Sequence, residues 1–122
     1  MDTTKWGPSG WVYLHTLTFN YPDNPSKKTK QIYKRYFTMT GDILPCKYCR
    51  ESYKEFIKEL PLEPALESRD KLTKWFYDIH NKVNNKLKKQ GLNKKKNPSF
   101  KSVCENYESF RASCSSIKHT CK

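Results

Sequence analysis

The 122-residue sequence contains no long hydrophobic run, so no segment is expected to span a membrane. Its apolar stretches are a few residues long, whereas a membrane-spanning helix needs about 20. Residues 1–8 lack a basic segment followed by an apolar one, so we expect no secretory signal peptide. No repeat at solenoid spacing is present. No segment alternates polar and apolar residues over a useful length, which disfavours β-strands.

Acidic residues are also scarce, at 12 against 24 Lys and Arg, and the formal net charge is +12. Such a charge favours anionic partners: phosphates, nucleic acid or acidic protein surfaces. The densest run is the six lysines between Lys86 and Lys96, a pattern that is also typical of a solvated helix end and loop. Neither finger-type Cys and His spacing nor a glycine-aromatic RNA-binding motif is present. Nucleic acid therefore stays open as a partner, without a base-reading motif.

Aromatic residues make up 14% of the chain, enough for the small core of one domain. Proline, glycine and capping residues predict helices over residues 9–20, 27–40, 44–60, 68–90 and 99–112, with Ser9, Ser26 and Ser68 as N-caps. The faces expected to point inward are Trp11, Leu14, His15 and Thr18; Ile32, Tyr36 and Met39; Cys49, Tyr53, Phe56 and Leu60; Leu72, Trp75, Phe76, Ile79, Val83 and Leu87; and Val103, Tyr107 and Phe110. The pattern predicts an all-α domain over residues 1–112, a four-helix bundle plus a short fifth helix, followed by a cysteine-bearing tail over residues 113–122.

Five cysteines leave at least one thiol outside any intramolecular disulfide. Cys46 and Cys49 are three residues apart at a predicted helix start, about 5–6 Å between Cβ atoms and within bridging reach. A first helical turn, with Lys47 and Arg50 beside it, favours a thiolate and therefore a dithiol that switches readily to a disulfide. The alternatives are a structural disulfide or half of a zinc site, completed by two ligands from Cys104, Cys114, His119 or Cys121.

Polar and aromatic residues recur at helical spacing in the fourth predicted helix. His80 and Asn84 lie one turn apart on one face, and the first predicted helix carries Trp11 and His15. An imidazole, an amide and flat aromatic rings can together hold a planar heterocycle by stacking and hydrogen bonding. Each residue alone is ordinary, because a single helical histidine is most often a surface residue or one satisfied in the core.

Three motifs taken together resemble the Erv/ALR family of FAD-linked sulfhydryl oxidases. They stand in the family's order and read Trp6-Gly7-Pro8-x-x-Trp11-x-x-x-His15, Leu44-Pro45-Cys46-x-x-Cys49 and Trp75-x-x-x-x-His80-Asn81-x-Val83-Asn84. The resemblance covers residues 6–110. It implies a helical bundle with FAD at its mouth, usually a homodimer, that oxidises a protein dithiol or a thioredoxin-like relay and passes electrons to oxygen, producing hydrogen peroxide.

The resemblance also assigns individual roles. It places Cys49 beside the isoalloxazine, in the charge-transfer contact, and makes Cys46 the outer cysteine that exchanges with substrate thiols. It implies no metal site. The residues that it places around FAD are Gly7, Trp11, His15, Tyr77, His80, Asn81, Val83, Asn84, Lys86, Lys89 and Tyr107.

One departure from the family concerns a structural disulfide that many cellular members carry. Its first cysteine falls at Tyr77 and its second near Ser102, with Cys104 only close, so this disulfide is missing. Short forms without it resemble those of large DNA viruses. That likeness implies a location in the host cytoplasm, a virus factory or a virion.

The tail cysteines have several possible roles. Family members often place a second pair in a flexible tail, and Cys114 and Cys121 are possible shuttle residues of this kind. They lie about 10 Å apart along an axis if both belong to one helix, so a shuttle requires a helix end between them. The alternatives are a structural bond from Cys104 to either, or free thiols.

The main rival function is a basic module that binds nucleic acid or an acidic protein and holds a structural zinc. A further rival is a redox-inactive FAD-binding scaffold, against which the only argument is that both core cysteines are kept.

Overall fold

The computed structural model describes residues 1–112, which are helical and contain no strand in that range. The helices are α1 Thr3–Phe19, α2 Lys27–Ile43, α3 Lys47–Glu59, the short 3-10 helix η1 Glu63–Glu67, α4 Arg69–Lys89 and α5 Phe100–Glu108. The predicted all-α architecture of four helices and a short fifth is confirmed. None of the helices in the described range combines the length and the apolarity needed to cross a membrane.

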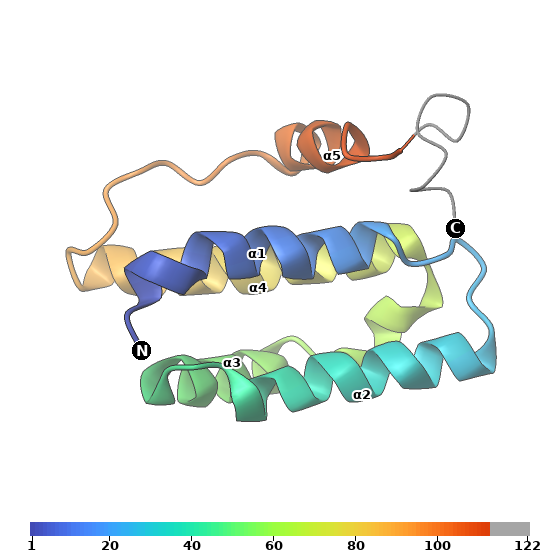
Figure 1. Ribbon diagram of the computed structural model, residues 1–122, viewed down its shortest axis with the longest axis horizontal. Coiled ribbons are helices and arrows are strands. Elements are labelled where there is room, and N and C mark those ends of the chain that lie inside the picture. The colour runs from blue at the N-terminus through green and yellow to red at the C-terminus, as the bar shows by residue number, and fades with distance from the viewer. Residues whose placement is uncertain (113–122) are drawn as a thin grey trace.

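The four long helices form two layers (Figure 1). Helix α1 lies along α4, and α2 lies along α3, while α3 and α4 pack against each other and join the layers. Helix α5 covers α1 on the side away from α2 and α3, after a long connection that leaves the end of α4 (Figure 1). Helix η1 packs on both α2 and α4. The arrangement leaves α4 in contact with α1, α3 and η1, so α4 organises the fold.

Aromatic residues fill the space between the layers. The rings of Phe37 and Phe76 are fully buried with centroids 5.6 Å apart, and Trp75 packs edge-on against Phe37 at 6.0 Å. Polar ends of buried rings find backbone partners, because an unpaired buried donor is costly. The Trp75 Nε1–H donates to the Leu60 carbonyl at 2.8 Å, and the Tyr53 hydroxyl donates to the Phe37 carbonyl at 2.5 Å. These bonds fix α3 against both neighbouring helices.

Helix α1 begins earlier than predicted. The expected N-cap, Ser9, lies inside the helix, and the observed N-cap is Asp2, whose Oδ1 accepts the Thr4 N–H at 2.9 Å. Proline residues were used to predict where helices begin and end, and this failed at α1 because Pro8 lies within the helix. Pro8 has no N–H, so the carbonyl of Thr4 lacks its usual partner within the helix. Thr4 is exposed in the first turn, where water can bind that carbonyl instead.

Helix α2 corrects two expectations. It continues through Gly41 to Ile43 instead of ending near residue 40, because Gly41 is a close-packing position against α3 and not a helix exit. The face predicted to point inward is wrong: Ile32, Tyr36 and Met39 are 51%, 38% and 57% exposed. The residues that α2 buries are Phe37, Thr40 and Gly41. The sequence of α2 carries two apolar stripes, and only one of them can face the core.

Helices α3 and α5 are shorter than predicted. Residues 44–46 precede α3, so Pro45 lies before the first turn and Cys46 is the N-cap. Helix α5 ends at Glu108 and not at residue 112, and Phe110, predicted on its packed face, is 48% exposed. The N-caps predicted at the second and fourth helices are confirmed, and α4 ends as expected before Gly91, whose φ of 73° suits only glycine without strain.

Candidate active site

The two core cysteines lie at the start of α3, where Cys46 caps the helix. Its Sγ accepts the Cys49 N–H at 3.3 Å, an N-cap bond in which sulfur takes the place of the usual oxygen. Cys46 has an extended backbone, with φ −156° and ψ 124°. Both side chains are half-buried and both are thiols in this structure. Cys46 and Cys49 are therefore adjacent, as their spacing predicts. Cys46, however, is the N-cap of α3 and not a residue of its first turn.

The environments of the two thiols separate their pKa values. A hydrogen bond from the Cys49 thiol, followed by backbone N–H groups of the first turn, lowers the pKa of Cys46. Burial raises the pKa of Cys49 to about 11. Cys46 is therefore the thiol that ionises first, and Cys49 is the inner, protonated one.

A second group of residues meets where α1, α4 and α5 touch. The Trp11 ring stacks on the His80 ring with centroids 3.6 Å apart and planes 9° apart. His15 Nε2 lies 2.9 Å from His80 Nδ1 in a hydrogen bond between the two rings. The Tyr107 ring packs on His15 at 5.1 Å, and Phe76 meets His15 edge-on at 4.7 Å. Helical spacing predicted the partners within each helix, and the structure brings the three helices together.

Burial keeps the two histidines of this group neutral. It lowers the pKa of His15 to about 3 and that of His80 to about 4. In a neutral pair one ring nitrogen donates and the other accepts. His15 Nδ1 is then left buried and without a hydrogen-bond partner among residues 1–112. An orphaned polar atom amid flat rings suits a planar heterocycle that offers a complementary hydrogen-bonding edge.

The remaining predicted cofactor residues lie along α4 and at the start of α1. Val83 packs against the core, while Asn81 and Asn84 are half-buried and their amides have no hydrogen-bond partner in the described part of the chain. Gly7 is half-buried, with open space where a Cβ would stand. Lys89 is exposed. The two amides therefore have hydrogen-bonding capacity, and Gly7 has adjacent space, that a ligand could use.

Tyr77 has a structural contact of its own. Its hydroxyl donates to the Pro98 carbonyl at 2.6 Å, and its ring packs against Phe100 at 5.2 Å. Tyr77 therefore ties the connection after α4 to the helix. Its predicted role around FAD stays a prediction.

The cysteine pair and the aromatic group are linked through α4. Lys86 Nζ donates to Ser52 Oγ at 2.5 Å, and Lys82 pairs with Glu59 at 2.6 Å, so α4 runs antiparallel to α3. Ser52 follows Cys49 by one turn, so the cysteine pair lies near the last turns of α4. Figure 1 shows the start of α3 and the end of α4 at the same end of the molecule. The 1.5 Å rise per residue puts that end about 13 Å along the axis from His80. The site is therefore elongated, with the thiols at one end and the flat rings further along.

Two residues that contribute to the site were not predicted from the sequence. Phe19 stacks on Tyr107 with centroids 5.3 Å apart, and its position four residues after His15 was the available signal. Arg50 was noted only as a nearby charge, whereas its guanidinium donates to the Leu44 carbonyl beside the cysteines. No local pattern predicts that second contact.

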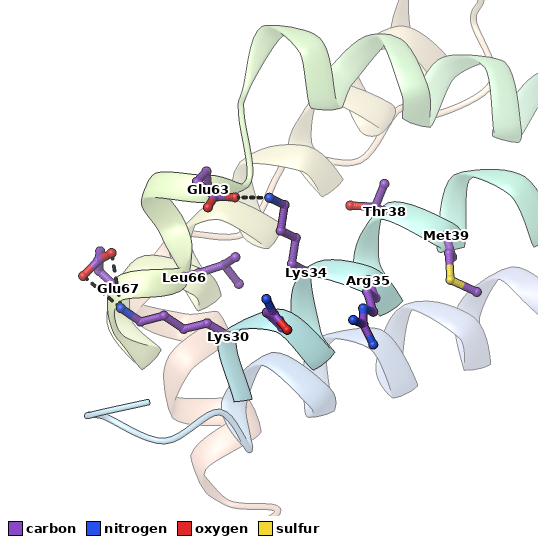
Figure 2. A pocket seen from close by; sticks show the side chains of 9 residues that line it. Lys30, Lys34, Arg35, Thr38, Met39, Glu63, Leu66 and Glu67 are labelled. Atoms are coloured by element: carbon purple, nitrogen blue, oxygen red, sulfur yellow. Dashed lines mark hydrogen bonds and ion pairs between the residues drawn. The ribbon is translucent and has the colours of Figure 1, made fainter. Parts of the chain in front are cut away.

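The groove in Figure 2 lies elsewhere, between α2 and η1. It has a volume of about 480 Å³ and contains none of the predicted site residues. Lys30 and Lys34 reach across it to Glu67 and Glu63, at 3.4 and 2.8 Å (Figure 2). Its lysines are thus paired within the protein, and it does not resemble a site for the chemistry of the cysteines.

Several of the residues predicted to take part in the chemistry belong to the C-terminal tail. Cys114, His119 and Cys121 lie outside the described residues, as does the predicted tail segment 113–122. Cys104 is a half-buried thiol on α5, and burial raises its pKa. Among residues 1–112 no three His, Cys, Asp or Glu side chains gather in a group that could hold a metal ion.

Comparison with known proteins agrees with the motifs and the fold. A sequence model of the Erv1/Alr family matches residues 8–108. The chain belongs to the Erv1/Alr family. The resemblance inferred from the three motifs is thereby confirmed.

Among relatives, the chain is 39% identical over 85 residues to the probable FAD-linked sulfhydryl oxidase R368 of Acanthamoeba polyphaga mimivirus. It is 35% identical over 88 residues to the mitochondrial FAD-linked sulfhydryl oxidase ERV1 of Saccharomyces cerevisiae. These matches cover 69% and 72% of this chain but only 59% and 46% of those proteins. The chain therefore spans about half the length of the curated Erv1/Alr relatives that it matches.

The solved structures show the same helical fold. The crystal structure of the FAD binding domain of Erv1 from Saccharomyces cerevisiae aligns with a TM-score of 0.79 at 28% identity. The alignment covers 92% of this chain and 99% of that one. The crystal structure of the yeast Erv1 core aligns with a TM-score of 0.72 at 31% identity. The similarity thus extends over a whole Erv1/Alr domain.

Proposed function

We propose that this chain is an FAD-dependent thiol oxidase that makes disulfide bonds in protein substrates. The observation that carries the proposal is the Cys46–Cys49 pair at the start of α3, with thiols of separated pKa, in a fold shared with the FAD binding domain of yeast Erv1. Relatives in mimivirus and yeast are named FAD-linked sulfhydryl oxidases.

The residues present fit FAD. The orphaned His15 Nδ1, the rings of Trp11 and His80, and Tyr107 supply flat surfaces and a free polar atom in one place. Lys86 and Lys89 at the end of α4 supply positive charge suited to a diphosphate. When bound, FAD would accept two electrons from the reduced cysteine pair and pass them to oxygen. We infer that Gly7, Tyr77, Asn81, Val83 and Asn84 complete its surroundings.

The cysteines perform the exchange with substrate. A substrate thiolate attacks Cys46 Sγ of the Cys46–Cys49 disulfide, which forms a mixed disulfide and releases Cys49. The second substrate thiolate then attacks the substrate sulfur of that mixed disulfide. Cys46 leaves readily because its pKa is the lower of the two. One substrate disulfide forms, and the two protons of the substrate thiols end on Cys46 and Cys49, so the core pair ends as two thiols.

The first experiment is a visible absorption spectrum of the purified protein, with oxygen consumption after addition of a dithiol. We expect a flavin spectrum and oxygen uptake. Cys46→Ser and Cys49→Ser should each abolish turnover and retain bound FAD, whereas Cys104→Ser should retain both. Full activity in either core variant would refute the assignment. A colourless protein with stoichiometric zinc that unfolds with a chelator would favour the zinc-binding module.

A homodimer is part of this proposal. Exposed apolar residues lie on two helices, Val12 and Tyr13 on α1 and Ile32, Tyr36, Met39 and Ile43 on α2, and Tyr13 and Tyr36 are neighbours. Covering such a patch with a second copy removes apolar surface from water. Met39→Lys should lower the molar mass measured by light scattering to that of a monomer, and Leu92→Lys, an equal change on an exposed loop residue, should not. Equal masses for the two variants would contradict a dimer through this face.

The tail and the location complete the proposal. We infer that Cys114 and Cys121 relay electrons from a protein substrate or thioredoxin-like partner to the core pair. Replacing both by Ser should slow oxidation of a protein substrate and spare a small dithiol, and equal rates would contradict the relay. The viral relatives support action in a host cytoplasm, a virus factory or a virion.

A further inference from the structure

The carbonyl oxygen of Leu44 accepts two hydrogen bonds immediately before the cysteine pair. One comes from the Cys46 N–H at 2.8 Å, across Pro45. The other comes from Arg50 Nη1 at 2.5 Å, a side chain one turn further along α3. The Leu44 side chain is itself packed against the core. Two hydrogen bonds and one packing contact therefore fix Leu44, the residue that leads into the cysteine pair.

Arg50 holds Cys46 from its backbone as well. The Arg50 N–H donates to the Cys46 carbonyl at 3.0 Å, the first backbone bond of α3. Its side chain returns past the cysteines to the residue two positions before Cys46. No carboxylate pairs with Arg50 among residues 1–112, and the side chain is half-buried, so its charge has no counter-ion. Burial raises the pKa of Cys49, and the nearby Arg50 charge acts in the opposite direction by favouring its thiolate.

The N-cap bond depends on the oxidation state of the cysteines, and the Arg50 bond does not. Cys46 Sγ accepts from the Cys49 N–H while it is a thiol or thiolate. Forming the disulfide makes Cys46 Sγ a weaker acceptor and turns it toward Cys49. The guanidinium remains charged in both states, and its acceptor is a backbone carbonyl that undergoes no redox change.

We propose that Arg50 is a positioning residue for the Cys46–Cys49 pair: it anchors the Leu44 carbonyl so that Cys46 stays at the helix start in both oxidation states, and its charge favours the thiolate of the reduced pair. This inference rests on the redox role proposed above. Stabilising the thiolate form stabilises the reduced state, so Arg50 makes the disulfide easier to reduce. Loss of Arg50 should shift the pair toward the disulfide.

The test measures the ratio of disulfide to dithiol at Cys46 and Cys49 in anaerobic glutathione buffers, with the whole 122-residue chain loaded with FAD. Thiols are trapped by alkylation, and chymotrypsin, which cuts after Tyr48, separates the two cysteines for mass spectrometry. The pH dependence of alkylation is measured on the same samples. Neither readout requires turnover with oxygen.

The variants are Arg50→Met, Arg50→Lys and the matched control Lys47→Met. Arg50→Met removes both the charge and the bond that fixes it beside the pair. It should shift the equilibrium about tenfold toward the disulfide, the effect of losing a nearby positive charge that lowers a thiol pKa by about one unit, because only the charge interacts differently with the two oxidation states. Its alkylation profile should move to higher pH. Arg50→Lys keeps the charge but lacks the planar donor that reaches the carbonyl, and should lie between Arg50→Met and the wild type. Lys47→Met removes an exposed charge with no contact to Leu44 and should shift the equilibrium less than Arg50→Lys does.

Three results overturn the proposal. The first is a disulfide–dithiol equilibrium in Arg50→Met equal to that of the wild type, and the second is a shift in Lys47→Met as large as that in Arg50→Met. The third is a wild-type equilibrium in Arg50→Lys, which would mean that the charge acts alone and that Arg50 does not position the pair. Should Arg50→Met fail to fold, Arg50→Gln replaces it, with thermal unfolding and bound FAD as checks. A wild-type pair that never exchanges with glutathione contradicts the proposed function itself, a result distinct from unchanged Arg50 variants.

Discussion

Replacing Gly41 by Ala tests the contact that holds α3, and with it the cysteine pair, against α2. Two effects of opposite sign compete. Alanine is favoured over glycine inside a helix by about 1 kcal/mol. However, a Cβ on Gly41 would lie 3.0 Å from Tyr53 Cδ1 and 3.2 Å from Lys54 Cγ, both tighter than ordinary contacts. Overpacking of this kind typically costs about 1–3 kcal/mol.

The outcome depends on whether the Tyr53 ring can move. The ring is 5% exposed, and its hydroxyl is held by the Phe37 carbonyl at 2.5 Å, so a shift away from Gly41 stretches a buried hydrogen bond. We therefore expect the steric cost to exceed the helical gain. Gly41→Ala should lower the free energy of unfolding by about 1 kcal/mol net, which corresponds to a fall of about 4 °C in Tm.

Gly10→Ala is the matched control, because a Cβ there would meet the Trp6 ring at 3.5 Å, an ordinary contact. It should raise the free energy of unfolding by about 0.5–1 kcal/mol. The assay is urea unfolding followed by circular dichroism at saturating FAD, with the m-value as a check on the two-state fit. In a Tyr53→Phe background, where the ring is free to shift, Gly41→Ala should cost less. If Gly41→Ala instead stabilised the protein as much as Gly10→Ala, the close contact would not be limiting and this reasoning would be wrong.

Two further predictions concern buried polar groups. His15 and His80 have folded-state pKa values of about 3 and 4, below the unfolded value near 6.5, so the unfolded chain binds their protons first. Their contribution to stability is complete above pH 6.5 and should fall between pH 6.5 and 5 by up to about 1.4 kcal/mol per pH unit for each histidine, as measured by urea unfolding; a His15→Gln, His80→Gln double variant with the same pH slope would contradict this. Tyr21→Phe should lower the free energy of unfolding by about 1–3 kcal/mol, because the buried Leu66 carbonyl loses the 2.6 Å bond from the Tyr21 hydroxyl. Tyr48→Phe, at a ring that is 75% exposed, should change it by less than about 0.5 kcal/mol, and equal effects would rule out the buried bond as the cause.

Local signals in the sequence were sufficient for most of the fold. Ser26 and Ser68 cap helices as predicted, since an N-cap bond joins residues three apart and requires no partner from elsewhere. The inward stripe of α4 is confirmed in Leu72, Trp75 and Phe76, because α4 has one dominant apolar face. Helix boundaries were less secure: the first helix is predicted to begin at Ser9 and the second to end near residue 40, but Ser9 and Gly41 both lie inside helices.

By itself, the sequence determined the helical class, the spacing of Cys46 and Cys49 and the three motifs of the family, since these depend on neighbours along the chain. Only the tertiary structure decided which stripe of α2 is buried, because that choice depends on the surfaces of α3 and η1. It also decided the contact of His15 with His80, which joins residues 65 apart, and the bond of Arg50 to the Leu44 carbonyl. Such contacts arise when separate elements pack, and neither helical periodicity nor capping preference contains that information.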